Sequence, residues 1–340
     1  MLKTDRDAQM MAWVQAQFPG KTIDVLPASA DASFRRYFRV TLPDGGTQIL
    51  MDAPPEKEDS TPFVKVAGLV ESAGLCGPKV LAQDLAQGFL LLTDLGRLSY
   101  LAALETEPEL ADVLMRPVLD VLVQWQQSSR PDVLPPYDAA LLRRELDLFP
   151  EWFISTHLDA TLTDEEKAAL ENIFSLLIAS AVAQPKVFVH RDFMPRNLMV
   201  VESEPVLTPG ILDFQDAVYG PITYDVVSLF RDAFISWEEE QEIDWVVRYW
   251  EKARAANLPV HADFADFWQA YEWMGLQRHL KVLGIFCRLN YRDGKAHYLT
   301  DLPRFIGYVR KTAGRYIAFK PLLNLLDRLE NKAEDIAYTF

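Results

Sequence analysis

The chain of 340 residues is long enough for two modest domains, and its content of 49% hydrophobic and 11% aromatic residues excludes an intrinsically disordered protein. Its 49 acidic residues outnumber its 34 basic ones and give a net charge of −15. This balance argues against nucleic acid as a partner, because phosphate backbones are bound by cationic surfaces.

Three further features point to a cytoplasmic protein without membrane contact. No uncharged apolar run reaches the length of about eighteen residues that a membrane span needs. The N-terminus is charged and lacks the apolar core of an export signal. The two cysteines, Cys76 and Cys287, have neither metal-binding nor redox spacing, so we expect them to be buried reduced thiols.

The first part of the chain, up to about residue 95, is expected to form a helix followed by a small antiparallel sheet. Residues 5–18 carry apolar side chains at helical spacing, and residues 61–73 form a second amphipathic segment that ends at Gly74. Strand-like segments lie at residues 33–40, 47–51, 79–83 and 88–92. The first two flank Pro-Asp-Gly-Gly at residues 43–46, which is typical of a β-hairpin turn.

From about residue 99 onward the pattern is helical, apart from short strands near residues 187–212. Helices are predicted at residues 108–127, 139–156, 163–183, 237–255, 264–289 and 302–319. A small β lobe before a large helical lobe that bears His-Arg-Asp at residues 190–192 predicts an α+β, bilobal fold like that of protein kinases. The nucleotide-binding lobe is placed at residues 1–95, and the helical lobe, with the catalytic loop and substrate site, at residues 97–340.

A short connector, formed by Thr93, Asp94, Leu95 and Gly96, joins the two predicted lobes. In such an architecture ATP lies between the lobes, with its adenine against the backbone of Thr93, Asp94 and Leu95. Backbone groups suit this role because adenine needs a donor and an acceptor held rigidly side by side. An ordinary turn between lobes is the alternative interpretation of this segment.

Two polar clusters carry the chemistry of the chain. His190-Arg191-Asp192 with Asn197 has the spacing of the H-R-D-x-x-x-x-N catalytic loop, and Asp213-Phe214-Gln215 follows like a D-F-G segment. Asp192 would accept the proton of an attacking hydroxyl, and Asn197 and Asp213 would hold Mg²⁺ beside the phosphates of ATP. Magnesium prefers oxygen ligands, and a carboxylate with an amide oxygen suits it.

Apolar runs flank these clusters at residues 187–189, 198–201 and 211–212. They predict short buried strands that deliver the polar groups to the mouth of a cleft. Chance strings on a loop are the alternative. Two such clusters in this order, each behind a strand-like run, argue against chance.

Several features of protein kinases are missing. There is no G-x-G-x-x-G and no A-P-E, Gln215 replaces the last glycine of D-F-G, and Met194 stands where a lysine is usual, although Pro195 is kept. These differences disfavour a protein substrate.

These motifs carry a resemblance over nearly the whole chain. The segments VHRDFMPRN, ILDFQDA and YGPITYDVVSL resemble those of the aminoglycoside phosphotransferase family of small-molecule kinases. Within that family, ASADASFRRYFRV, ILMDAPPEKED and QRHLKVLGIFCRLNYRDGK are similar to the anomeric amino-sugar kinases of bacterial cell-wall recycling. The resemblance implies ATP- and Mg²⁺-dependent phosphorylation of the C1 hydroxyl of N-acetylmuramate and N-acetylglucosamine. It also implies a product that a uridylyltransferase then uses.

The phosphate contacts depart from the usual pattern. Ala-Asp-Ala-Ser at residues 30–33 replaces a glycine-rich loop, so small residues ending at Ser33 would let backbone N–H groups approach phosphate. Strand alternation places Arg36 on an otherwise apolar face, where it could contact the β- or γ-phosphate or, at a bulge, turn to solvent. The third strand has no lysine, and Lys57 and Lys65 lie just beyond it. The cation that replaces this lysine stays open.

Other polar residues divide into expected structure and possible specificity. We expect His190 to hold the loop through backbone carbonyls and Asp225 to brace the same loop. Candidates for substrate contact are Arg191, Arg196, Asp216, Arg278 and Lys281. Arg278 and Lys281 share a helix face and could meet a sugar carboxylate, or form a solvated face, or pair with acidic residues.

Other interpretations of the chain remain open. Aromatic residues Trp268, Tyr271 and Trp273 could stack on a sugar ring, but their helical spacing favours core packing. An aminoglycoside, choline or homoserine kinase of the same family is the nearest alternative function. A pseudokinase-like binding module is another, and the intact Asp192, Asn197 and Asp213 argue against it.

Overall fold

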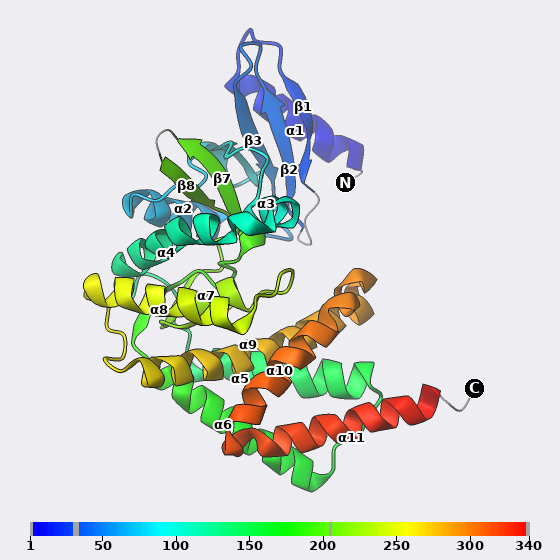
Figure 1. Ribbon diagram of the computed structural model, residues 1–340. Coiled ribbons are helices and arrows are strands. Elements are labelled where there is room, and N and C mark those ends of the chain that lie inside the picture. The colour runs from blue at the N-terminus through cyan, green and yellow to red at the C-terminus, as the bar shows by residue number, and fades with distance from the viewer. Residues whose placement is uncertain (1–2, 30–33, 204–205, 338–340) are drawn as a thin grey trace. The chain divides into compact units, whose positions relative to one another are not determined.

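The computed structural model describes residues 3–29, 34–203 and 206–337. These residues form two compact units (Figure 1). The first unit comprises Met1–Trp125 and Pro195–Ala217, and the second comprises Gln126–Met194 and Val218–Phe340. No helix within the described ranges is long and apolar enough to cross a membrane.

The first unit is built on a five-stranded antiparallel sheet with the strand order β1-β2-β3-β5-β4. The strands are β1 (Asp24–Ser29), β2 (Arg36–Thr41), β3 (Thr47–Asp52), β4 (Val80–Asp84) and β5 (Phe89–Thr93). The predicted hairpin is confirmed: β2 pairs with β3, and Gly45, at φ +86°, donates its N–H to the carbonyl of Leu42 at 2.9 Å. The sequence pattern did not indicate β1, because Pro27 interrupts it; proline is tolerated there since β1 is an edge strand.

A helix covers this sheet and closes its core. Helix α1 (Lys3–Gln17) lies across the strands in Figure 1, and its buried Met10 and Val14 pack with Val40, Leu50 and Phe89 of the sheet. The predicted helices at residues 5–18 and 61–73 are thus confirmed, the second as α2 (Thr61–Ser72). This apolar layer gives the strands a rigid support.

The other described elements of the first unit are four helical segments and a hairpin. They are α3 (Tyr100–Thr106), the 3-10 helix η1 (Pro108–Leu110), α4 (Ala111–Gln127), the 3-10 helix η3 (Pro195–Asn197) and the strands β7 (Leu198–Ser203) and β8 (Val206–Ile211). The strands confirm two of the predicted apolar runs, and they pair antiparallel. Backbone hydrogen bonds join this hairpin to the rest of the unit, from the N–H of Val200 to the carbonyl of Leu98 and from the N–H of Ile211 to the carbonyl of Cys76, both at 2.8 Å.

The two cysteines differ in burial. Cys287 of the second unit is buried, as expected, whereas Cys76 is only half-buried, so the expectation that Cys76 is buried was wrong.

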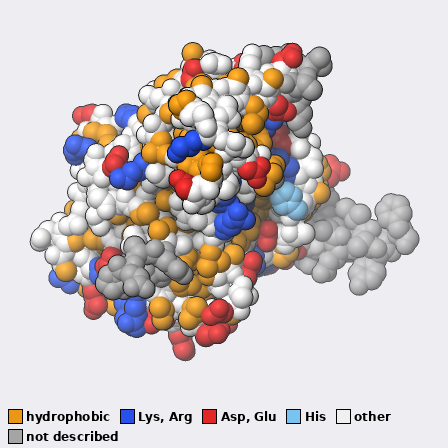
Figure 2. Space-filling view, turned by 90° about the horizontal axis from the view of Figure 1, so that it is seen from above, with side chains coloured by type: hydrophobic (Ala, Val, Ile, Leu, Met, Phe, Trp, Pro, Cys, Tyr) orange, Lys and Arg blue, Asp and Glu red, His pale blue; other side chains and the backbone are white. Residues whose placement is uncertain are grey.

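The second unit is mainly helical. Its helices are α5 (Ala139–Leu146), the π-helix η2 (Phe149–His157), α6 (Asp164–Ala183), α7 (Tyr224–Phe230), α8 (Glu239–Ala255), α9 (Phe264–Asp293), η4 (Ala296–Asp301), α10 (Leu302–Arg315), η5 (Ile317–Phe319) and α11 (Lys320–Ala337). Strand β6 (Lys186–Val189) pairs with β9 (Val218–Pro221). Helix α9 is buried along much of its length and contributes to one large apolar core with α6, α10 and α11. In the view of Figure 2, acidic and basic side chains are interspersed with hydrophobic ones.

Two predicted helices are wrong in extent. Residues 139–156 divide into α5 and η2, because Pro150 lacks the N–H of a continuous helix and Leu148 lies directly against α9 at Gly284. Residues 302–319 end as a helix at Arg315, since Tyr316 is extended. Helix α11 was missed, although Leu322, Leu325, Leu326 and Leu329 form its buried stripe.

The close approach at Gly284 gives a stability prediction. A Cβ at this position would lie 2.4 Å from the backbone carbonyl of Leu148. Because backbone atoms cannot easily move away, we expect Gly284→Ala to lower the free energy of unfolding by about 1–3 kcal/mol. A Cβ at Gly307 of α10 would meet no atom within 4 Å, so Gly307→Ala should raise it by about 0.5–1 kcal/mol. Urea denaturation of both variants measures this, and equal stabilities would contradict the packing at Leu148.

Candidate active site

The segment that follows β6 is held by one buried carboxylate. Asp225, in the first turn of α7, is fully buried and accepts hydrogen bonds from the backbone N–H of His190 at 2.7 Å and of Arg191 at 3.0 Å. The expected bracing role of Asp225 is confirmed. Two consecutive N–H groups bound to one carboxylate fix the backbone conformation immediately before Asp192.

The backbone is strained at two of the predicted site positions. Arg191 has φ +78° and Asp213 has φ +62°, in the left-handed region that costs non-glycine residues about 1–2 kcal/mol. Such conformations persist where the surroundings hold them and are enriched at functional sites. At Arg191 the holding group is Asp225.

The charge state of Asp225 is shaped by its surroundings. Burial raises the pKa of its carboxyl to about 7, and the negative charge of Asp192 acts in the same direction. The two backbone N–H bonds and the charge of Arg278 oppose this shift. The ring nitrogen Nδ1 of His190 accepts a hydrogen bond from the backbone N–H of Asp192 at 3.3 Å. We expected His190 to bind backbone carbonyls, but its partner in this hydrogen bond is a backbone N–H.

The two predicted metal ligands lie together in the first unit. Asn197, at the end of the 3-10 helix η3 (Pro195–Asn197), donates through Nδ2 to Oδ2 of Asp213 at 3.4 Å. The carbonyl of Asn197 also accepts the N–H of Leu212 at 2.9 Å, which ties the two segments together. Gln215, in place of the usual glycine, donates to Oδ1 of Asp213 at 2.9 Å, and Phe214 packs against Phe63 of α2.

The donor set at this place fits Mg²⁺. Asn197 and Asp213 offer amide and carboxylate oxygens and are half-buried. No group of three or more His, Cys, Asp or Glu that could hold a metal occurs among the described residues. A site with few protein ligands suits Mg²⁺, which keeps waters and binds substrate phosphates as its other ligands.

The connector is fixed by an ion pair that was not predicted from the sequence. Arg39 of β2 binds Asp94 through Nε at 2.5 Å and donates to the carbonyl of Gly96 at 2.7 Å. The N–H of Thr93 is bonded to the carbonyl of Lys79, whereas the N–H and C=O of Leu95 form no hydrogen bond with another described residue. The backbone N–H of Leu95 could donate a hydrogen bond to adenine, and its C=O could accept one.

The phosphate-contact candidates have different outcomes. Ser33 and the rest of residues 30–33 lie outside the described residues. Arg36 lies opposite Asp52 in the β2–β3 register, binds it through Nε at 2.8 Å and also binds Asp7 at 2.7 Å. Asp52 is fully buried and additionally accepts Arg6 at 2.9 Å. Arg36 is therefore held by acidic side chains and does not turn freely to solvent. To contact an ATP phosphate, its guanidinium would have to bind the phosphate and Asp52 at the same time.

The substrate candidates of the second unit are engaged by internal partners. Arg191 and Lys281 both bind Glu145, at 2.7 and 2.8 Å, and Arg278 donates to Ser228 Oγ at 3.0 Å. Arg278 and Lys281 are buried, so the solvated-face alternative was wrong and pairing with an acidic residue is confirmed for Lys281. A substrate carboxylate at Lys281 would have to displace Glu145, whereas Nη1 of Arg278 is buried and has no hydrogen-bond partner among the described residues.

The remaining candidates divide by exposure. Arg196 and Asp216 are exposed in the first unit, and Gln215 donates to Asp216 at 3.4 Å. Tyr271 is fully buried with its hydroxyl on Glu242, which confirms core packing for that residue. Glu145 was not predicted from the sequence, because an acidic residue in a helical stripe gives no local signal of burial.

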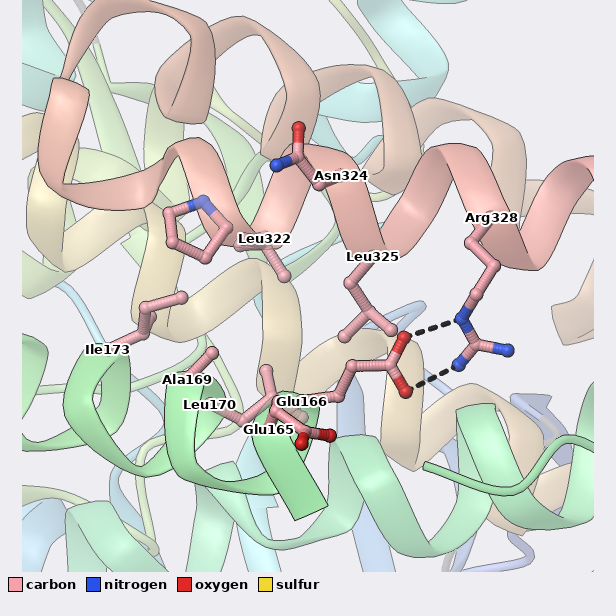
Figure 3. Close-up of a pocket in the computed structure, with 10 residues that line it drawn as sticks. Glu165, Glu166, Ala169, Leu170, Ile173, Leu322, Asn324, Leu325 and Arg328 are labelled. Atoms are coloured by element: carbon pink, nitrogen blue, oxygen red, sulfur yellow. Dashed lines mark hydrogen bonds and ion pairs between the residues drawn. The ribbon is translucent and has the colours of Figure 1, made fainter. Parts of the chain in front are cut away.

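A separate hollow lies between α6 and α11 (Figure 3). It has a volume of about 240 Å³, and Ala169, Leu170 and Leu325 contribute to its apolar lining. At its edge Glu166 and Arg328 form a bidentate ion pair, with Nε to Oε1 at 2.5 Å and Nη2 to Oε2 at 2.9 Å. None of the predicted site residues lines it.

Known proteins resemble this chain over most of its length. Residues 24–273 match the model of the phosphotransferase enzyme family. The chain is 47% identical to the N-acetylmuramate/N-acetylglucosamine kinase of Neisseria meningitidis serogroup B, over 98% of this chain and 99% of that protein. It is 52% identical to the protein of the same name in Pseudomonas aeruginosa, over 92% of this chain and 90% of that protein.

A solved structure shows the same fold. The ADP-bound aminoglycoside phosphotransferase APH(2'')-Ib is 15% identical and has a TM-score of 0.58, with 90% of this chain and 99% of that chain covered. The predicted kinase-like fold, a small antiparallel sheet with a helical C-terminal part, is therefore confirmed, as is the predicted resemblance. The chain belongs to the phosphotransferase enzyme family.

Proposed function

We propose that the chain is an ATP- and Mg²⁺-dependent kinase that phosphorylates the anomeric C1 hydroxyl of N-acetylmuramate and N-acetylglucosamine. The observation that carries this proposal is the near-complete coverage of relatives that bear this name at 47% and 52% identity. The ADP held by the APH(2'')-Ib structure supports an adenine nucleotide as donor. We further propose a cytoplasmic role in cell-wall recycling, with the product consumed by a uridylyltransferase.

In this proposal Asp192 is the base. It accepts the proton of the sugar hydroxyl as the oxygen attacks the γ-phosphoryl group. An anomeric hydroxyl is more acidic than an ordinary alcohol, so a carboxylate of modest basicity suffices. The hydrogen bonds that Asp225 accepts from the backbone N–H groups of His190 and Arg191 support this role, because they fix the chain immediately before Asp192.

The other predicted residues are assigned to binding. Asn197 and Asp213 would hold Mg²⁺, which neutralises charge on the phosphates when bound. Ser33, Arg36, Thr93, Asp94 and Leu95 are proposed for the nucleotide. Substrate contacts are proposed for Arg196, Asp216 and Arg278. Arg191 and Lys281 were candidates as well, but both bind Glu145 instead.

The substrate class is tested by ADP release measured with a coupled assay. We expect turnover with N-acetylmuramate and N-acetylglucosamine, and none above background with aminoglycosides, choline or homoserine. A polycation would need an acidic pocket, whereas Lys281 and Arg191 add positive charge beside Glu145. Preferred turnover of an aminoglycoside or choline would contradict the proposed substrate.

The base is tested by Asp192→Asn. We expect kcat with either sugar to fall at least about 100-fold, because the amide cannot accept the proton. Asp244→Asn is the matched control, since Asp244 is half-exposed and pairs with Arg248 one turn along the same helix. It should keep kcat within about twofold. Near wild-type turnover by Asp192→Asn would remove Asp192 from this role.

The metal ligands are tested by a Mg²⁺ titration of activity. Asp213→Asn removes one negative charge from the ligand pair, so the Mg²⁺ concentration for half-maximal rate should rise about tenfold or more. Chelation of Mg²⁺ by EDTA should abolish turnover of the wild-type protein. An unchanged Mg²⁺ dependence in Asp213→Asn would contradict the assignment.

A further inference from the structure

One buried carboxylate, that of Glu145, binds several polar side chains near the segment before Asp192. Glu145 is 6% exposed and accepts Arg191 Nη2 at 2.7 Å, Lys281 Nζ at 2.8 Å and Gln277 Nε2 at 3.3 Å. The hydroxyl of Tyr137 donates to the same carboxylate. These donors come from three segments: the approach to α5, the turn after β6, and α9.

Local structure sets this arrangement. Asp138 caps α5 by accepting the N–H of Leu141 at 2.8 Å, and this short helix places Glu145 in its last turn. Gln277 and Lys281 lie one turn apart on α9 and so face the same neighbour. All of these residues belong to one compact unit.

The cluster is ionised despite its burial. Burial alone would raise the pKa of the Glu145 carboxyl, but the charges of Lys281 and Arg191 hold it below its usual value. Burial would likewise lower the pKa of Lys281, and the charge of Glu145 raises it instead. A carboxylate therefore faces two cations in a poorly solvated place.

The same two cations also interact with Asp192. The negative charge of Asp192 contributes to the raised pKa of both Arg191 and Lys281. The charge of Asp192 also raises the pKa of Asp225, and the charge of Arg278 opposes this shift. Asp192 directly follows Arg191 in the chain, so its carboxylate is a second anion that acts on the cations bound by Glu145.

We propose that Glu145 is a positioning residue that binds Arg191 and Lys281 as counter-ions and so keeps the Asp192 carboxylate available to the acceptor hydroxyl. Glu145 acts through these cations and does not contact the substrate. The inference rests on the proposed role of Asp192 as base. Without Glu145, the two cations turn to Asp192 and occupy the oxygens that must accept the proton.

Lys281 thereby has a role that does not depend on the substrate carboxylate. It also donates to the hydroxyl of Tyr224 at 2.9 Å, which holds its ammonium group on the inner side of the helix. Loss of Lys281 should therefore affect N-acetylmuramate, which carries a carboxylate, and N-acetylglucosamine, which does not, to the same extent.

The main test compares Glu145→Gln with the charge-balanced double variant Glu145→Gln/Lys281→Met. We expect Glu145→Gln to lower kcat about 30-fold with both sugars and to leave the KM for ATP within about twofold. The double variant should recover about tenfold in kcat, because one of the competing cations is gone. Glu171→Gln is the matched control, since Glu171 also binds an arginine, Arg143 at 2.6 Å, but is half-exposed; its kcat should stay within about twofold.

A kcat for Glu145→Gln within about threefold of wild type would overturn the proposal, and so would a double variant no faster than Glu145→Gln. If Glu145→Gln does not fold, Lys281→Met alone decides. Its kcat should stay within about fivefold of wild type and its KM should change equally for both sugars. A KM increase of more than about fivefold for N-acetylmuramate alone would make Lys281 a substrate contact and overturn the assignment.

Wild-type turnover separates this inference from the proposed function. If the wild-type protein uses neither amino sugar, the proposed substrate is wrong. The same variant ratios are then measured on the slow hydrolysis of ATP, in which water is the acceptor. A decrease in Glu145→Gln with recovery in the double variant would still support Glu145 as the positioning residue, and its absence would overturn it.

Discussion

The carboxylate of Asp225 is the constraint on which the turn before the proposed base depends. It accepts two consecutive backbone N–H groups and holds Arg191 in a left-handed conformation that is unfavourable by about 1–2 kcal/mol. A buried acceptor of this kind is needed because nothing in the local sequence favours that conformation. The side chain of Arg191 then points to Glu145, so one residue is fixed at its backbone by one carboxylate and at its guanidinium by another.

Helix α9 carries these constraints through the second unit. It places Lys281 on Glu145 near its middle and Glu272 on the fully buried Arg231 about two turns earlier. Each contact pairs opposite charges from different segments, and removal of one partner would leave a buried charge uncompensated. Helix α9 therefore contacts α5, α7 and α8 through specific polar side chains in addition to its apolar packing. These contacts hold the short helix α5 so that Glu145 meets Arg191 and Lys281.

Much of the fold could be predicted because its signals are local. The β2–β3 hairpin follows from a turn sequence, and the strand before His190 follows from an apolar run. The partners of the site could not be predicted, since Glu145 and Lys281 are far apart in sequence and each looks like an ordinary helix residue. The division of residues 139–156 depends likewise on the close approach of Leu148 to Gly284, which no periodicity records. For Arg36, alternation correctly indicated an unusual position, but its partner Asp52 appears only when the strands are paired.

The transfer of phosphate to the anomeric oxygen of an amino sugar is the central claim about this protein. The most direct measurement is phosphorus-31 nuclear magnetic resonance of the product formed from N-acetylglucosamine, ATP and Mg²⁺. We expect a sugar phosphate whose phosphorus couples to the anomeric proton H1, and the reaction should leave the other hydroxyls unmodified. Coupling to the C6 methylene protons, or the absence of any sugar phosphate, would contradict it.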